Sequence, residues 1–280
     1  MFFPASSCEE KTIIGILALE VFMPMAIKKV DEDRFDRQKR VDGWNQEAVS
    51  ASKVLVVGAG ALGNEVVKLL VQLGVGEIAA VDYDKIVKAN LNRCVFFDDG
   101  SAEKGELKVE ALAREAAKLG PSKITPVAKK IEDLQEGFFG GFSHAFGCLD
   151  NLGARLTLNA HCYSKMPLID GGTAGFMGKV QVAAKPSSCV ECGMSRQDYK
   201  LLWKKYSCVG ELLDFFDPKM PALPTTTSLV AAIQVNEFVK LLHSKEGLAG
   251  KYLSFNGLTG KSTIFGVPKR KGCPVHGDKN

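Results

Sequence analysis

A glycine-rich turn stands between segments with the patterns of a buried strand and a helix. Gly58, Gly60 and Gly63 are spaced as G-x-G-x-x-G, and an apolar run over 54–57 precedes them. Glycines at this spacing allow a tight turn and a close backbone approach, so that N–H groups at the start of a helix can face phosphate oxygens. Asp82 follows about twenty residues later, where a carboxylate can accept hydrogen bonds from ribose hydroxyls. The pattern predicts a nucleotide site without specifying which nucleotide.

Three charged residues further along favour cleavage of a triphosphate over hydride transfer. Arg93 ends the segment 89–93, and Lys108 opens an expected helix. Two cations that converge on one phosphate chain stabilise the negative charge that builds up on its oxygens in the transition state, and a dehydrogenase has no such need. Asp150 is expected at the end of a later strand, at the sheet edge where open α/β folds bind ligands. A lone carboxylate there suits Mg²⁺, which keeps most of its waters.

Eight cysteines are the unusual feature of the composition, and they are too sparse for a disulfide framework in a chain of 280 residues. Cys189 and Cys192 form one two-ligand pair, and Cys273 and His276 form another. Together the two pairs can surround a tetrahedral Zn²⁺. Because four protein ligands leave no open position, the zinc is predicted to be structural.

The other cysteines divide by their surroundings in the sequence. Cys94, Cys148 and Cys162 lie in or beside apolar segments, and we expect them to be small core residues. Cys8 lies in the N-terminal tail. Cys208 lies in a long irregular stretch of the kind that is usually functional, and nearby lysines favour its thiolate. It is therefore a candidate nucleophile, with an inert loop cysteine as the alternative.

These side chains must be positioned by alternating strands and helices, which predicts an α/β fold. Strands over 54–57 and 77–81, joined by a helix over 62–73 that Gly74 ends, form a βαβ unit. The further expected elements are helices over 106–119, 154–164 and 225–242, strands over 145–148, 167–170 and 179–184, and a closing hairpin around Asn256 and Gly257.

The overall composition excludes several classes of protein. A net charge of only +4 argues against nucleic-acid binding, which needs a concentrated basic face. The apolar run over 12–19 is far shorter than the roughly 20 residues of a membrane span, and the acids before it do not fit a signal peptide. We therefore expect a cytoplasmic protein with no nucleic-acid or membrane partner. Residues 1–30 are interpreted as an N-terminal extension, for which a start codon assigned too far upstream is one explanation.

In this order the motifs resemble those of the ubiquitin-activating-enzyme superfamily, the MoeB/ThiF/HesA-type adenylating enzymes. The resemblance runs from about residue 34 to residue 277. Besides the glycine turn it rests on Arg34-Phe35-Asp36-Arg37-Gln38, Asp82-Tyr83-Asp84, Asn90-Leu91-Asn92-Arg93, Lys108, Cys148-Leu149-Asp150-Asn151 with Arg155 and Asn159, Asp170-Gly171-Gly172-Thr173 and the Cys189/Cys192 pair. It implies a Rossmann-like mixed β-sheet flanked by helices, in one domain over 31–280 with a zinc knuckle and a crossover loop over about 193–224.

The resemblance also implies a nucleotide site for ATP. The implied nucleotide-binding residues are Gly58, Gly60, Gly63, Asp82, Asp84, Asn90, Asn92, Arg93, Lys108, Leu149, Asp150 and Asn151. Among them, Asn92, Arg93 and Lys108 would bind the triphosphate, and Asp150 would hold Mg²⁺. Members of this kind form homodimers, in which the arginine matching Arg37 reaches the partner's nucleotide site.

Two positions depart from the pattern of these enzymes. Cys94 stands where a glutamine commonly follows the arginine, and we expect only a local change in packing. His276 replaces the fourth cysteine that is usual in the family, so that the zinc site becomes Cys₃His.

The activity that the resemblance implies is ATP-dependent adenylation of the C-terminal glycine of a ubiquitin-like protein with a Gly-Gly end, followed by a thioester on Cys208 and transfer to a conjugating enzyme. The implied catalytic residues are Arg37, Arg93, Lys108, Asp150 and Cys208. One alternative shares the adenylation step but serves a sulfur-carrier protein in molybdopterin, thiamine or tRNA thiolation. Others are a non-catalytic regulatory subunit and an NAD-dependent dehydrogenase, which would need neither Arg93 nor Lys108.

Overall fold

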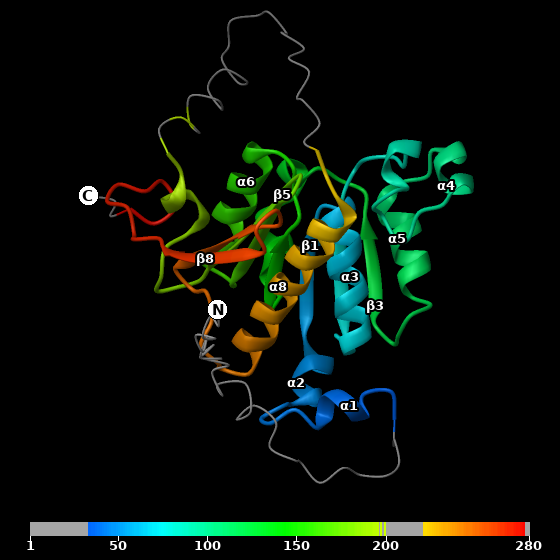
Figure 1. Ribbon diagram of the computed structural model, residues 1–280, viewed down its shortest axis with the longest axis horizontal. Coiled ribbons are helices and arrows are strands. Elements are labelled where there is room, and N and C mark those ends of the chain that lie inside the picture. The colour runs from blue at the N-terminus through cyan, green and yellow to red at the C-terminus, as the bar shows by residue number, and fades with distance from the viewer. Residues whose placement is uncertain (1–32, 196, 198, 200–220, 278–280) are drawn as a thin grey trace, which may run out of the picture. The chain divides into compact units, whose positions relative to one another are not determined.

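An eight-stranded sheet organises the part of the chain that the structure describes, residues 33–195, 197, 199 and 221–277 of a computed structural model (Figure 1). Its strands lie in the order β3-β2-β1-β4-β5-β6-β7-β8. They are β1 (Lys53–Val57), β2 (Glu77–Val81), β3 (Lys123–Val127), β4 (His144–Gly147), β5 (Leu168–Ala174), β6 (Met177–Ala183), β7 (Lys251–Asn256) and β8 (Lys261–Gly266). The first five strands in this order, β3, β2, β1, β4 and β5, are parallel. Strands β6, β7 and β8 continue the sheet by antiparallel pairing. The sheet is mixed, which confirms the predicted fold class.

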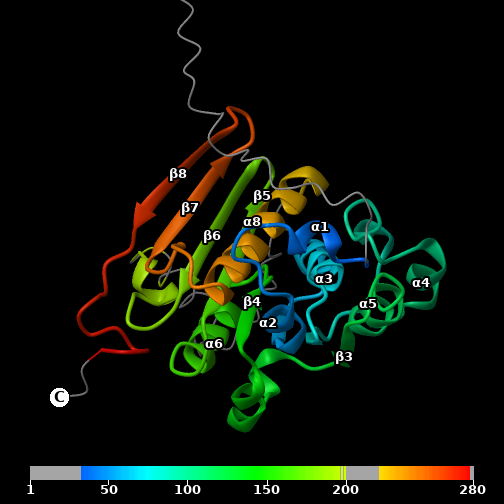
Figure 2. The ribbon, with the colours of Figure 1, turned by 90° about the horizontal axis from the view of Figure 1, so that it is seen from below.

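Helices cover both faces of this sheet. One face carries α3 (Ala61–Leu73), α5 (Lys108–Ala116) and α8 (Pro224–Leu242), and the other carries α6 (Leu152–Cys162), as Figure 2 shows. The shorter helices are α2 (Gln46–Ala51) and α4 (Asp99–Lys104), and 3₁₀ turns are η1 (Lys88–Asn90), η2 (Ile131–Asp133), η3 (Glu136–Gly141) and η4 (Val190–Gly193). Within the described residues, no helix has both the length and the apolar character needed to cross a bilayer.

The central strand β1 shows why the apolar run in the sequence forms a buried strand. Val54 and Val56 pack into the layer with α3, α5 and α8, while Leu55 and Val57 face the layer with α6. Each of these side chains is at most 1% exposed. Alternating side chains can all be apolar only when both faces of a strand are covered, as they are here.

The predicted βαβ unit is present with nearly the predicted bounds. Helix α3 ends at Gly74, which has a φ of 83° and donates from its N–H to the carbonyl oxygens of Leu70 and Val71. A left-handed residue at this position is most easily a glycine, and it satisfies carbonyl groups that the helix leaves without partners.

Several elements differ from the sequence-based prediction, which did not include the short helices α2 and α4. The helix expected over 106–119 begins only at Lys108, because Leu107 forms a β-bridge with Lys85 and the Glu106 carbonyl accepts from Ile86. Strand β3 was not predicted, since it is mostly exposed and contains Pro126. Proline is tolerated there because β3 lies at the edge of the sheet.

The chain divides into two compact units, Met1–Asp42 and Gly43–Asn280. The described part of the first unit contains α1 (Asp36–Lys39), where the Asp36 carboxylate pairs with the Arg40 guanidinium at 2.5 Å. The predicted extension over 1–30 lies outside the described residues and stays a prediction. The sheet and the other helices that the structure describes belong to the second unit.

Candidate active site

The turn between β1 and α3 has close contacts that explain two of its three glycines. Gly58 has a φ of 98°, and a Cβ there would lie 2.3 Å from the Cys148 carbonyl oxygen. A Cβ on Gly63 would lie 1.8 Å from the Gly58 carbonyl oxygen. A Cβ on Gly60 would meet no atom within 4 Å. Gly58 and Gly63 therefore serve the packing of the turn, and Gly60 leaves open space at the N-terminus of α3, where anions bind favourably.

Substitutions of these glycines should separate stability from ligand binding. Gly63→Ala is expected to lower the free energy of unfolding by about 3 kcal/mol, because its methyl group forces the backbone apart. Gly60→Ala should unfold at nearly the parent temperature yet bind a non-hydrolysable ATP analogue about tenfold more weakly, since its methyl group enters the open space. Thermal unfolding and calorimetric titration of the two variants measure both effects. A Gly63→Ala variant as stable as the parent would contradict the packing role.

Asp82, Asp84 and Lys108 come together at the carboxyl end of β2. The Asp82 carboxylate accepts from the Ala59 N–H of the glycine turn at 2.7 Å and from the Asp84 N–H at 2.8 Å. The Lys108 ammonium, at the start of α5, donates to Asp84 at 2.6 Å, and its side chain is only 12% exposed. Burial would lower the pKa of Lys108, but the Asp82 carboxylate and the hydrogen bond to Asp84 outweigh it and raise the pKa. Lys108 is therefore held as a cation beside the turn.

The segment that carries Arg93 is held by its own polar side chains. Asn90 accepts from the Val87 N–H at 3.0 Å, and Arg93 donates to Asn92 at 2.8 Å and to the Ala89 carbonyl oxygen. This geometry gives Asn90 and Asn92 a local role in addition to the predicted one.

Cys94 directly follows Arg93 and is buried. Burial raises the pKa of the Cys94 thiol to about 11, while the positive charges of Arg93 and Lys108 act in the opposite direction. The charges of Arg93 and Lys108 thus both act on this segment, which follows β2 along the chain.

Sequence reasoning missed one residue of this site, Asn64 on α3. Its amide donates to the carbonyl oxygens of Ala59 and Gly60 at 2.8 and 3.0 Å, and it accepts from the Phe96 N–H at 3.1 Å. It is fully buried. Asn64 thus ties the glycine turn to the segment after Arg93. The available signal was a polar residue among apolar neighbours in a helix, which is uncommon unless its groups find partners.

Asp150 lies beyond the carboxyl end of β4, the strand next to β1. Its side chain is exposed and has no hydrogen-bond or ionic partner within the described residues. Burial raises the pKa of Tyr83, and the carboxylates of Asp84, Asp82 and Asp150 raise it further. The neighbouring Asn151 caps α6 by accepting from the Ala154 N–H at 2.8 Å, and Leu149 is half-buried.

The residues at this edge fit ATP and Mg²⁺. The open space at Gly60 and the N-terminus of α3 suit phosphates, and the Lys108 cation lies beside them. The Asp150 carboxylate has free oxygens of the kind that Mg²⁺ prefers.

A second cluster brings together the four predicted zinc ligands. The Cys189 sulfur lies 3.8 Å from that of Cys192 and 3.6 Å from that of Cys273, and the Cys192 sulfur lies 2.9 Å from Nε2 of His276. All four ligand atoms lie within 4.8 Å of one another. Sulfur atoms around a tetrahedral Zn²⁺ are about 3.8 Å apart, so the geometry fits this metal. The C-terminal segment after β8 folds back onto η4, as the spacing requires.

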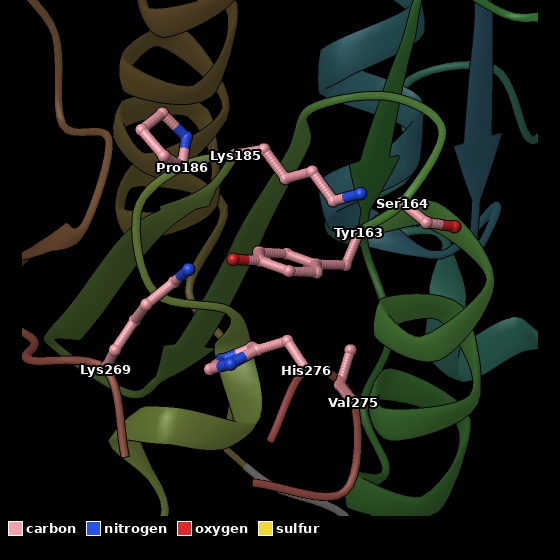
Figure 3. A pocket seen from close by; sticks show the side chains of 7 residues that line it. All are labelled: Tyr163, Ser164, Lys185, Pro186, Lys269, Val275 and His276. Atoms are coloured by element: carbon pink, nitrogen blue, oxygen red, sulfur yellow. The ribbon is translucent and has the colours of Figure 1, made fainter. Parts of the chain in front are cut away.

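Residues around the cluster orient its ligands. Asn159 of α6 accepts from the Val190 N–H at 3.0 Å, and the Arg270 N–H donates to the Cys192 sulfur at 3.4 Å. Beside the cluster lies a pocket of about 420 Å³ (Figure 3). The rings of Tyr163 and His276, whose centroids are 5.0 Å apart, lie together in it. These contacts join the cluster to α6 and thus to the body of the fold.

The remaining described cysteines are core residues, as expected. Cys94, Cys148 and Cys162 are 2%, 8% and 0% exposed. Burial raises the pKa of all three thiols, that of Cys162 to about 12, so none is suited to act as a thiolate nucleophile. The predicted nucleophile Cys208 lies outside the described residues, as does Cys8. Arg37 belongs to α1 in the first unit.

A sheet with a glycine turn, a nearly enclosed lysine cation and an exposed carboxylate at one edge defines an α/β protein built to bind a phosphate-bearing ligand. The model of the ThiF family matches residues 33–275, and the chain belongs to that family.

Named relatives agree with this assignment. The molybdopterin-synthase adenylyltransferase of Salmonella typhimurium is 29% identical over 253 residues, covering 87% of this chain and 96% of that protein. The catalytic subunit of the Nedd8-activating enzyme E1 of Drosophila melanogaster is 28% identical, covering 79% of this chain and 65% of that protein. The structure of Escherichia coli MccB with MccA-N7isoASN has a TM-score of 0.73 at 20% identity over 90% of this chain and 76% of that one. The chain is thus an enzyme of the adenylyltransferase type, and the predicted alternative of a dehydrogenase is not supported.

Proposed function

We propose that this enzyme adenylates the C-terminal glycine of a ubiquitin-like or sulfur-carrier protein. The observation that carries the proposal is the nearly enclosed Lys108 ammonium, held by Asp84 beside the glycine turn, with the exposed Asp150 carboxylate beyond the neighbouring strand β4. This arrangement suits a reaction that builds negative charge on a triphosphate.

In the proposed reaction, the carrier's carboxylate attacks the α-phosphorus of ATP. The bond from this phosphorus to the bridging oxygen breaks, pyrophosphate leaves, and an acyl-adenylate forms. Lys108 and Arg93 bind the phosphate oxygens and offset their growing charge, and the N–H groups at the start of α3 face the same oxygens. Asp82 and Asn64 hold the turn in place through Ala59.

Three further roles complete the proposal. Asp150 would hold Mg²⁺, which neutralises phosphate charge when bound. Arg37 would reach the nucleotide site of a second copy in a homodimer. The cluster of Cys189, Cys192, Cys273 and His276 would hold a structural Zn²⁺.

In a second step, the Cys208 thiolate would attack the acyl carbon of the adenylate. A thioester forms, AMP leaves, and the thiol proton passes to solvent. A conjugating enzyme would then receive the carrier in the cytoplasm, where thiols stay reduced. If the product serves sulfur transfer instead, as the name of the Salmonella relative suggests, the first step is unchanged and the adenylate passes to a sulfur donor.

Exchange of labelled pyrophosphate into ATP tests the first step, with candidate carriers that end in Gly-Gly. Exchange should require the carrier and should be lost when its terminal glycine is removed. If the protein binds Mg·ATP but catalyses no pyrophosphate exchange with any Gly-Gly carrier, the proposed substrate class is wrong.

The Cys208→Ala variant tests the second step. It is expected to keep pyrophosphate exchange within about twofold and to lose the thiol-sensitive adduct with the carrier completely, because only the acyl acceptor is removed. Denaturing gels with and without reductant detect the adduct. Cys8→Ala is the matched control and should retain it. An adduct that persists in Cys208→Ala would assign the nucleophile elsewhere.

A further inference from the structure

Arg155 joins the beginning of α6 to the segment that carries Asp150. One guanidinium nitrogen donates to the Asp170 carboxylate at 2.5 Å, and the other donates to the Leu149 carbonyl oxygen. The side chains of Arg155 and Asp170 are only 11% and 2% exposed. A single buried side chain therefore holds the backbone immediately before Asp150.

The Asp170 carboxylate fits against the end of β4. A Cβ on Gly147 would lie 2.4 Å from its Oδ1 atom, so this strand must end in glycine for the carboxylate to fit. Gln234 of α8 also binds here, donating to the carbonyl oxygens of Gly147 and Ile169 at 3.2 and 2.9 Å. Polar side chains from α6, β5 and α8 thus contact the end of β4 and the residues that follow it.

A buried ion pair is a poor source of stability, because removing two charges from water costs as much as their attraction returns. A pair of well-packed apolar residues in place of Arg155 and Asp170 could stabilise the fold as well. What the ion pair does supply is a donor with a fixed direction toward Leu149. Planar guanidinium groups can bind two acceptors at once in a set geometry, which lysine cannot.

We infer that Arg155 is a positioning residue for the Asp150 carboxylate. Asp170 orients the guanidinium, which fixes the Leu149 carbonyl group and so sets where Asp150 leaves the sheet. The inference rests on the proposed function, in which Asp150 holds Mg²⁺. Small displacements of a binding group are costly, so loss of this support should weaken Mg²⁺ binding more than metal-free nucleotide binding.

The test is calorimetric binding of a non-hydrolysable ATP analogue over a range of Mg²⁺ concentrations. The variant Arg155→Met/Asp170→Asn removes both charges and so avoids leaving a buried carboxylate unpaired. It should raise the Mg²⁺ concentration for half-maximal binding about tenfold and weaken metal-free binding far less. Combining it with Asp150→Asn should give no further loss, because both changes act through one carboxylate. Arg155→Lys, which keeps the charge but not the second hydrogen bond, should show a smaller shift of the same kind.

Arg114→Met is the matched control, since Arg114 is half-exposed and pairs with Glu106 on the surface. It should keep the parent's Mg²⁺ dependence. If the charge-free double variant and Arg155→Lys unfold at lower temperature but also keep that dependence, Arg155 is structural only and the inference is overturned. If the parent protein binds no nucleotide at all, the proposed function is wrong as well as the inference. A parent titration that shows no binding distinguishes this outcome from failure of the inference alone.

Discussion

Lys108→Met is expected to reduce carrier-dependent pyrophosphate exchange about a thousandfold, the cost of losing a preorganised donor to developing charge. Its ammonium is nearly enclosed beside the glycine turn, and the nearby carboxylates raise its pKa, so it stays charged throughout the neutral range. The loss should fall on the exchange rate more than on stability, because its partner Asp84 is 48% exposed and can be solvated.

Lys118→Met is the control for this substitution. Lys118 lies just beyond the same helix, is 65% exposed and pairs with Glu115. It should exchange at the parent rate and unfold at the parent temperature. A Lys108→Met variant that kept a tenth of the parent rate would show that the positive charge at this position is not central to the reaction.

Removal of zinc is expected to have the largest effect on stability. The purified protein should contain one zinc per chain, and Cys189→Ser should lose the metal and unfold more than about 10 °C below the parent. The physical reason is that Cys189 and Cys273 are buried with their sulfur atoms 3.6 Å apart, so that a zinc ion bound there would link two segments that no covalent bond joins directly. Elemental analysis and calorimetric unfolding measure the two effects.

Cys162→Ala provides the comparison for a buried cysteine outside the cluster. It should keep its zinc and lose only about 1 kcal/mol of stability, since it removes one sulfur atom from the core. Metal-free protein with the full stability of the parent would contradict a structural zinc.

The sequence predicted those parts of the fold whose signal is local. The run over 54–57, the glycine turn and Gly74 each impose a conformation on their own residues, and the βαβ unit followed from them. Strand β3 escaped prediction because its residues are mostly exposed and carry no apolar alternation. The late start of α5 was not predicted, because the bridge between Leu107 and Lys85 is a contact between segments distant in the sequence.

The same distinction holds for the site. Lys108, Asp82 and the zinc ligands were predicted because their residue types have few other uses at such spacing. Asn64 was missed, and no role was assigned to Arg155, because their value depends on partners far away in the sequence, Phe96 and Asp170. The packing of helices on the sheet decides which backbone group a buried amide or guanidinium contacts. The spacing of residues in the sequence does not reveal this partner.

The position of the metal cluster along the chain has a consequence for how the molecule assembles. Cys189 and Cys273 are separated by 84 residues, and the crossover region and α8 lie between them in sequence. A zinc ion held by both would act as a reversible cross-link, which removes about 4.5 kcal/mol of chain entropy from the unfolded ensemble. The segment between the two cysteines, which includes the proposed acceptor Cys208, would then form a loop that is closed only when zinc is bound. Maturation of the enzyme would thereby be timed by the availability of zinc as well as by translation.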